Sequence, residues 1–352
     1  MLIYTAIFVT NGNLHVYDEF MPAKLIKAAS YNIAFFFTVY VVFAVAEYLS
    51  ITLIYKVLNI TLWALIFYGI IQAIFNVHIP FINGTESSET ARIYLTAPEP
   101  SIAAPFFVTL SLTVIALRLY LHKPILLTAV TAGLSLLIVI LIGSKGVLVL
   151  LPVALVIAIR KKLTVKVIFL ATLILIPLTI VVIYKVIPML AMDLEGFNSI
   201  STRSTTWLAA FESLFIYPLG EGYGTYLVYF PPMLVPANHQ ITNVTGIPLL
   251  TFEIDSMIET GKYLGAKSGI ANQVLNNGFL AVIFTFLVSK HYLRLKKKVN
   301  YYSVQVVFSI IGIFLLVSFL FTTSLENAYY YLLPFVALDK IVLAKKESIA
   351  AL

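Results

Sequence analysis

The sequence predicts an all-α integral membrane protein, a polytopic helical bundle with about nine or ten spans. The first observation is composition: 61% of the 352 residues are hydrophobic and 11% are charged, whereas a water-soluble domain carries roughly 25% charged residues. The second is a series of apolar runs that approach the roughly 20 helical residues needed to cross a bilayer. The third is that these runs lack the alternation of a transmembrane barrel, so helices are expected.

Nine apolar runs are expected to span the bilayer. They cover residues 31–50, 57–77, 102–121, 125–142, 146–160, 166–187, 271–289, 302–322 and 328–343. The fifth and ninth runs are short, so a tilted or re-entrant segment is the alternative there. The first residues, MLIYTAIFVTNGN, are too short to cross and lack the basic start and cleavage site of a signal peptide. They are expected to form a short or truncated first helix.

Positive charge is distributed unevenly between the two sides of the predicted bundle. If successive runs alternate in direction, fifteen of the 23 Lys and Arg residues lie on one side, chiefly at 118–123, 160–166, 290–298 and 340–346. Loops rich in Lys and Arg face the cytoplasm, so the opposite side is predicted to be extracytoplasmic. The basic clusters are explained as anchors near anionic lipid head groups. No nucleic-acid partner is therefore expected.

The chain, 1–352, is predicted to be a single polytopic membrane domain with two long extracytoplasmic loops. The smaller loop covers 78–101 and the larger covers 188–270. Long loops in a compact protein are usually functional or disordered. The larger loop contains aromatic residues and a Pro-Pro pair and few low-complexity runs. It is therefore predicted to form a helical cap built from short helices.

Candidate anion-binding residues occur in the smaller loop and at a later corner between two spans. Arg92 precedes Glu99 and Pro100, which open the next run, and a helix N-terminus there would present free amide groups to an anion that Arg92 could clamp. The alternative is an interfacial ion pair between Arg92 and Glu99. Lys145 in Gly-Ser-Lys-Gly is either a second cation for the same ligand or a side chain that snorkels to the surface.

The larger loop contains the stretch STRSTTWLAAFESLFIYPLGEGYG, residues 201–224. A hydroxyl side chain at 201, 202 or 204 is expected to cap a helix that begins near Arg203. Trp207, Phe211 and Phe215, spaced by four, are expected to form one aromatic face against an apolar surface. The helix is expected to end at the proline at 218.

Three glycines follow that proline, at positions 220, 222 and 224. Glycine allows a tight fold of the backbone and a close approach to a ligand or to another helix. Simple packing is the alternative explanation for these glycines and for Trp207. Their occurrence beside Arg203 favours a functional site.

The chain resembles the O-antigen polymerase and O-antigen ligase superfamily of bacterial envelope polysaccharide assembly in three stretches: ARIYLTAPEPSIAA, GSKG and STRSTTWLAAFESLFIYPLGEGYGTY. The family pattern has an arginine followed by Glu-Pro, a Ser-Arg-Gly corner, and a large outer loop with Arg, Trp and Pro-Leu-Gly-x-Gly. The matching residues are Arg92, Glu99, Pro100, Ser144, Gly146, Arg203, Trp207, Pro218, Leu219, Gly220 and Gly222. Lys145 stands where arginine is usual. The resemblance covers about residues 85–290.

The resemblance implies a GT-C-like, inverting glycosyltransferase in the bacterial cytoplasmic membrane, with its active site facing the periplasm or exterior. It would move a glycan from undecaprenyl-pyrophosphate onto a lipid-linked acceptor and so polymerise the repeat units of an O-antigen, capsule or exopolysaccharide. The expected partners are the lipid-linked oligosaccharide, the bilayer and a chain-length regulator. The residues assigned to the substrate are Arg92, Glu99, Lys145, Arg203, Trp207, Gly220 and Gly222, and their cations would stabilise the departing pyrophosphate.

The acceptor hydroxyl also requires a proton acceptor. Ligase members carry a histidine just before the span after the large loop, whereas YLGAKSGIANQVLNNGFLAV, residues 263–282, has none. This absence favours a polymerase over a ligase, which remains the main alternative. Glu221 and His239 are the two candidate bases, and the sequence does not separate them.

Other chemistries are less well supported by the residue types. The outer side has no histidine–carboxylate cluster with metal-ligand spacing, so neither a metal nor a cofactor is expected. A flippase or transporter of lipid-linked oligosaccharide is a further alternative. It would require charges along a path between the leaflets, and such charges are scarce within the apolar runs.

Overall fold

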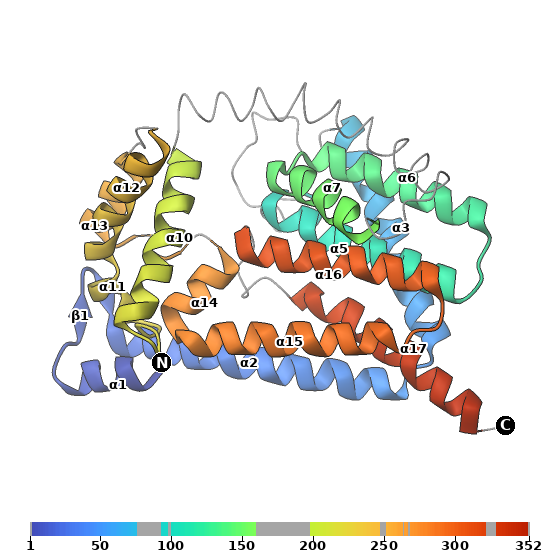
Figure 1. Ribbon diagram of the computed structural model, residues 1–352, viewed down its shortest axis with the longest axis horizontal. Coiled ribbons are helices and arrows are strands. Elements are labelled where there is room, and N and C mark those ends of the chain that lie inside the picture. The colour runs from blue at the N-terminus through green and yellow to red at the C-terminus, as the bar shows by residue number, and fades with distance from the viewer. Residues whose placement is uncertain are drawn as a thin grey trace. The chain divides into compact units, whose positions relative to one another are not determined.

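The computed structural model describes residues 2–75, 93–97, 100–159, 198–246, 251–262, 264–266, 268–321 and 329–350. Over these residues the chain is built of helices joined by short connections, with one two-stranded hairpin (Figure 1). The predicted all-α fold class is therefore confirmed. The run predicted at 166–187 lies outside the described residues.

Five of the described helices are long and apolar enough to cross a membrane. They are α2 (Met21–Tyr48), α3 (Ile51–Phe75), α5 (Pro100–Tyr120), α6 (Ile125–Ile142) and α16 (Tyr302–Phe321). A shorter apolar helix, α7 (Lys145–Ile159), occupies the fifth predicted run. Such helices are what a polytopic membrane protein requires, because a helix satisfies its own backbone groups in lipid.

The chain forms two compact units. Unit 1 contains residues Met1–Thr38, Ile187–Val288 and Phe319–Glu326, and unit 2 contains Val39–Val186, Ser289–Ser318 and Asn327–Leu352. The candidate residues of the larger loop belong to unit 1, whereas Lys145 belongs to unit 2.

Unit 1 begins with a short helix, as expected, followed by a small hairpin. Its elements are α1 (Leu2–Thr10), β1 (His15–Val16), β2 (Glu19–Phe20), the start of α2, α10 (Asn198–Ile216), α11 (Tyr226–Tyr229), α12 (Pro231–Thr245), α13 (Phe252–Thr260), α14 (Gly269–Asn277) and the first part of α15 (Phe279–Lys297). The strands pair antiparallel, His15 opposite Phe20. Helix α10 packs on α12, α13 and α14 (Figure 1). The buried apolar cluster of this unit includes Phe230, Leu234 and Met257. The larger predicted loop is thus helical over its described residues.

Unit 2 is organised around α5. This helix packs on α3, α6, α7 and α17 (Leu332–Ala350), and 72% of its apolar window is buried, more than in any other candidate span. A 3₁₀ turn, η3 (Tyr329–Tyr331), precedes α17. The ninth predicted run therefore corresponds to this turn and the first part of α17.

The predicted span at 271–289 is wrong, because the chain breaks at Gly278. Helix α14 starts at Ser268, whose hydroxyl accepts a hydrogen bond from the backbone of Ala271 (3.2 Å), and Gly278 follows its last residue with φ of 58°. Glycine at positive φ after a helix is a common stop signal. Hydropathy averaged over the run does not register this break, so the apolar stretch is divided between α14 and α15.

Candidate functional site

The Pro-Leu-Gly-Glu-Gly turn after α10 is tied to the junction of α14 and α15. The backbone N–H of Glu221 donates to the carbonyl of Leu275 (2.7 Å), and that of Phe279 donates to the carbonyl of Pro218 (2.8 Å). A third bond, from Gly220 to the carbonyl of Tyr217 (2.8 Å), closes the turn itself. The turn and the helix junction therefore satisfy each other's backbone groups.

Two glycines make this contact sterically possible. Gly220 has φ of 84°, and a side-chain carbon there would lie 2.5 Å from the backbone of Asn276 and Asn277. Gly278 would likewise place such a carbon against the backbone of Pro218 and Gly220. The close approach expected at Gly220 is thus an approach to α14. Its assignment to substrate stays a prediction.

The side chain of Glu221, which belongs to this turn, is buried. Its residue is 2% exposed, and neither carboxyl oxygen has a hydrogen-bond partner of good geometry among the described residues. Burial raises the pKa of Glu221 to about 8, and the nearby Ser213 hydroxyl opposes this only in part. That hydroxyl donates its own hydrogen to the carbonyl of Ala210 (2.9 Å). Glu221 is therefore a carboxyl that can exchange a proton near neutral pH.

Polar side chains from α2, α14 and the turn frame the same junction. The Nδ2 of Asn277 donates to the hydroxyl of Tyr223 (3.2 Å), which donates to Oδ1 of Asn32 (3.4 Å). Asn276, 4% exposed, donates to the carbonyl of Asn272 (2.8 Å), while its own Oδ1 is buried with no partner among the described residues. We call Glu221, Tyr223, Asn276 and Asn277 the Glu221 cluster. It contains two buried side chains with unused hydrogen-bonding capacity.

Tyr223 and the asparagines of this cluster are not among the site residues that the sequence motifs predict. The signal that could have identified them is the Asn-Asn-Gly stop within an apolar run, since such a stop places polar side chains at a helix end.

Three predicted site residues of unit 1 lie on α10 and α12. Arg203 on α10 and His239 on α12 are exposed. Trp207 is partly buried, packs on the apolar cluster, and donates its indole N–H to the carbonyl of Leu320 (3.3 Å). Its ring contacts that of Phe211, with centroids 4.3 Å apart. Trp207 thus packs within unit 1, and its assignment to substrate stays a prediction.

Two details predicted for this helix are wrong. Residues 201–204 do not cap it, because α10 is already helical from Asn198. Phe215 does not share the aromatic face that Trp207 and Phe211 pack against the apolar cluster. It lies in the last turn of the helix and is 82% exposed. The helix ends at Ile216, two residues before Pro218. This is expected, because a proline disfavours helical geometry at the residue before it.

Of the other predicted site residues, Arg92 and Glu99 lie outside the described residues, and Lys145 belongs to unit 2 whereas Arg203 belongs to unit 1. Pro100 is the first residue of α5, as predicted, and Lys145 is the first residue of α7. The segment just after Arg92 is anchored in unit 2, because Oε1 of Gln72 accepts the backbone N–H of Leu95 (2.8 Å).

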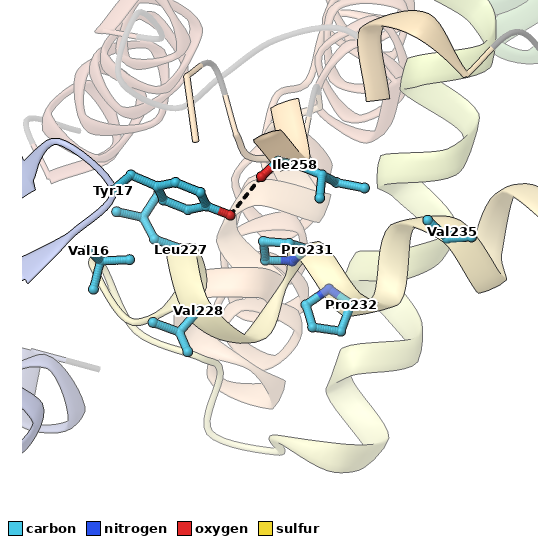
Figure 2. Close-up of a pocket in the computed structure, with 8 residues that line it drawn as sticks. All are labelled: Val16, Tyr17, Leu227, Val228, Pro231, Pro232, Val235 and Ile258. Atoms are coloured by element: carbon cyan, nitrogen blue, oxygen red, sulfur yellow. Dashed lines mark hydrogen bonds between the residues drawn. The ribbon is translucent and has the colours of Figure 1, made fainter. Parts of the chain in front are cut away.

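Unit 1 also contains an open apolar groove of about 530 Å³. Figure 2 shows its lining, which comes from the hairpin, α11, α12 and α13 and includes Val16, Pro231 and Val235. The hydroxyl of Tyr17 donates a hydrogen bond to the carbonyl of Ile258 (2.8 Å) (Figure 2). No charged side chain lines the groove. The groove therefore offers an apolar surface, whereas the Glu221 cluster contains an ionisable group.

Within the described ranges, no group of three or more His, Cys, Asp and Glu side chains is placed to hold a metal ion. Comparison with known proteins identifies no relative: no family model, no curated protein and no solved structure matches the chain.

Proposed function

We propose that this protein is a polysaccharide repeat-unit polymerase of the bacterial cytoplasmic membrane, with Glu221 as its general base. It would transfer a glycan from undecaprenyl-pyrophosphate onto a lipid-linked acceptor. The observation that carries the proposal is a buried carboxyl without a partner, located within the Pro-Leu-Gly-Glu-Gly motif that resembles the polymerase and ligase superfamily. The apolar helices supply the membrane setting that such a donor requires.

Glu221 is better suited than His239 to remove a proton from the acceptor hydroxyl. General bases work best when their pKa lies near the working pH, and the pKa of Glu221 is raised to about 8. At pH 7 about a tenth of such carboxyls would be ionised and able to accept a proton. His239 is exposed, so water surrounds it and no pocket orients it.

The proposed reaction is a single displacement at the anomeric carbon. The acceptor oxygen forms a bond to that carbon and gives its proton to Glu221, while the bond from the carbon to the pyrophosphate oxygen breaks. The departing pyrophosphate then carries additional negative charge. Arg203, exposed on α10, is a cation available to stabilise it, together with Arg92 and Lys145 as predicted from the motifs.

A buried ionisable group without a partner costs stability. Such groups concentrate at functional sites, where a shifted pKa is required. A purely structural position in this turn would be served equally well by glutamine, which has nearly the same shape and no charge. The presence of an acid at this position supports a role in proton transfer.

The test replaces Glu221 with Gln in the native host and separates the surface glycan on a gel. Long polymer is expected to disappear while single repeat units still reach their acceptor, because a general base contributes roughly 10²- to 10⁴-fold to the rate. Arg203→Ala is expected to behave in the same way. Membrane levels of each variant are checked by immunoblotting.

Two matched controls are Glu259→Gln, an exposed acid on α13, and His239→Gln. Both variants are expected to give the normal range of glycan lengths on the gel. A normal range for Glu221→Gln would exclude this carboxyl as the base. Loss of single units as well as long polymer would indicate export or ligation instead of polymerisation.

A further inference from the structure

Arg118 is buried within unit 2, in the last turn of α5, and is 1% exposed. Its Nε donates to the hydroxyl oxygen of Thr128 (3.3 Å) and its Nη1 to that of Thr131 (3.3 Å). The same Nη1 also donates to Oδ1 of Asn59 (3.2 Å). The third nitrogen, Nη2, is buried and has no acceptor among the described residues. One side of the guanidinium is therefore unused.

The charge of Arg118 is also not balanced by these partners. Thr128 and Thr131 donate their own hydrogens to the carbonyls of Pro124 (3.1 Å) and Leu127 (2.7 Å), so they serve as neutral acceptors. The C-terminal end of α5 supplies a partial charge equivalent to about half an elementary charge, whereas arginine carries a full one. Buried charges are normally paired. The site is thus short of an anion.

A second cation, Lys123, lies in the turn that follows α5. The backbone N–H of Lys123 donates to the carbonyl of Arg118 (2.9 Å), and the Lys123 ammonium lies 5.8 Å from the centre of the Tyr55 ring. Tyr55 and Asn59 are four residues apart on α3, so they share a face of that helix. Both cations therefore approach the same face of α3. In the described part of the chain, Lys123 forms no ion pair.

We propose that the turn between α5 and α6 is a binding site for a phosphate-type oxyanion, held by Nη2 of Arg118 and the ammonium of Lys123. Arginine suits this ligand because its planar donors match phosphate oxygens. Residues 122–125 of the turn are exposed and join two candidate spans, so a lipid head group or free phosphate can reach Lys123 directly. Because Nη2 itself is shielded, binding is expected to shift the turn. The proposal does not depend on the polymerase activity.

The experiment measures ligand-induced thermal stabilisation of the full chain, purified in a neutral detergent. One arm titrates inorganic phosphate at constant ionic strength, and a second titrates phosphatidylglycerol against phosphatidylcholine. A saturable rise in Tm is expected with phosphate, with phosphatidylglycerol or with both. A response to phosphatidylglycerol alone identifies a lipid head group, and a response to phosphate alone identifies the free ion. No saturable response in either arm would overturn the proposal.

Variants test whether the response comes from this site. Lys123→Gln removes an exposed side chain and is expected to fold and to weaken apparent affinity about tenfold, as for loss of one charge-assisted contact. Arg118→Lys keeps the positive charge but loses the planar set of guanidinium donors. It is expected to weaken the apparent affinity at least as much as Lys123→Gln. Lys297→Gln, an exposed lysine at the end of α15, is the control and is expected to bind normally. Equal responses in all three variants would show general screening and overturn the site.

Discussion

The backbone N–H of Glu221 donates to the carbonyl of Leu275 at 2.7 Å, so a turn that follows α10 is joined to the last residues of α14. The reciprocal bond from Phe279 to Pro218 closes the contact on its other side. In the same turn the Glu221 side chain is 2% exposed, and this burial raises the pKa of its carboxyl group.

Gly278→Ala and Gly220→Ala are each expected to lower stability by about 3 kcal/mol or more. Both positions have positive φ, and at both an added carbon would meet backbone atoms that cannot move aside. Gly246→Ala is the matched control, since it has φ of 69° but open space around it, and is expected to cost only about 1 to 2 kcal/mol. Thermal unfolding of the three purified variants makes the comparison. Equal losses at all three positions would mean that φ alone matters and that the contact is loose.

Glu221→Gln is expected to stabilise the protein at pH 8 while removing the proposed activity. The pKa of Glu221 rises from an ordinary 4.5 to about 8 in the folded chain, so the folded state binds this proton more tightly than the unfolded state. The bound proton on Glu221 contributes its full stabilisation of the folded state below pH 4.5. This contribution is lost as the pH rises to about 8, and the stability changes no further above that pH. The total change is about 5 kcal/mol, or roughly 1.4 kcal/mol per pH unit.

Unfolding measured from pH 5 to pH 9 tests this expectation. The Tm of the wild type should fall from pH 5 to about pH 8 and then level off, and the Tm of Glu221→Gln should fall markedly less. Glu259→Gln, with its exposed side chain, should follow the wild type. Parallel profiles for all three proteins would show that Glu221 is solvated and that its pKa is ordinary.

Phe211→Ala and Phe215→Ala, one helical turn apart on α10, are expected to have opposite outcomes. Phe211 packs on the apolar cluster of unit 1 and on the ring of Trp207, so its truncation should cost about 3 kcal/mol. Phe215 is mostly exposed, so its truncation should change the stability of the purified protein by less than about 0.5 kcal/mol. Chemical unfolding in detergent distinguishes them. A large loss at Phe215 would indicate that another surface covers it.

Gln72→Leu is expected to destabilise unit 2 by about 1 to 3 kcal/mol, because it leaves the buried N–H of Leu95 without its acceptor. Tyr68→Phe is the control, since it removes only the 3.1 Å contact between the Tyr68 hydroxyl and the Gln72 amide. Hydrogen exchange at the Leu95 amide reports the change directly. Unaltered protection in Gln72→Leu would show that this side chain does not anchor the segment after Arg92.

Local patterns in the sequence were sufficient for the class of the protein and for several of its helices. The run at 125–142 is helix α6 with the same bounds. The run predicted at 302–322 is helix α16, which covers Tyr302–Phe321. These predictions succeed because hydropathy and helix length are properties of a continuous segment. The motif around Glu221 and the two candidate bases could likewise be read from neighbouring residues.

Tertiary structure decided which of those candidate residues is buried and what contacts it. Glu221 is buried, and its backbone N–H is bonded to a residue more than fifty positions later in the chain, whereas His239, equally plausible by residue type, is exposed. The unused nitrogen of Arg118 likewise depends on α3 and α6 meeting α5. By itself the sequence determined helices, membrane character and a short set of candidate residues. Burial, pairing and pKa arise from packing between distant segments, and only the folded chain brings those segments together.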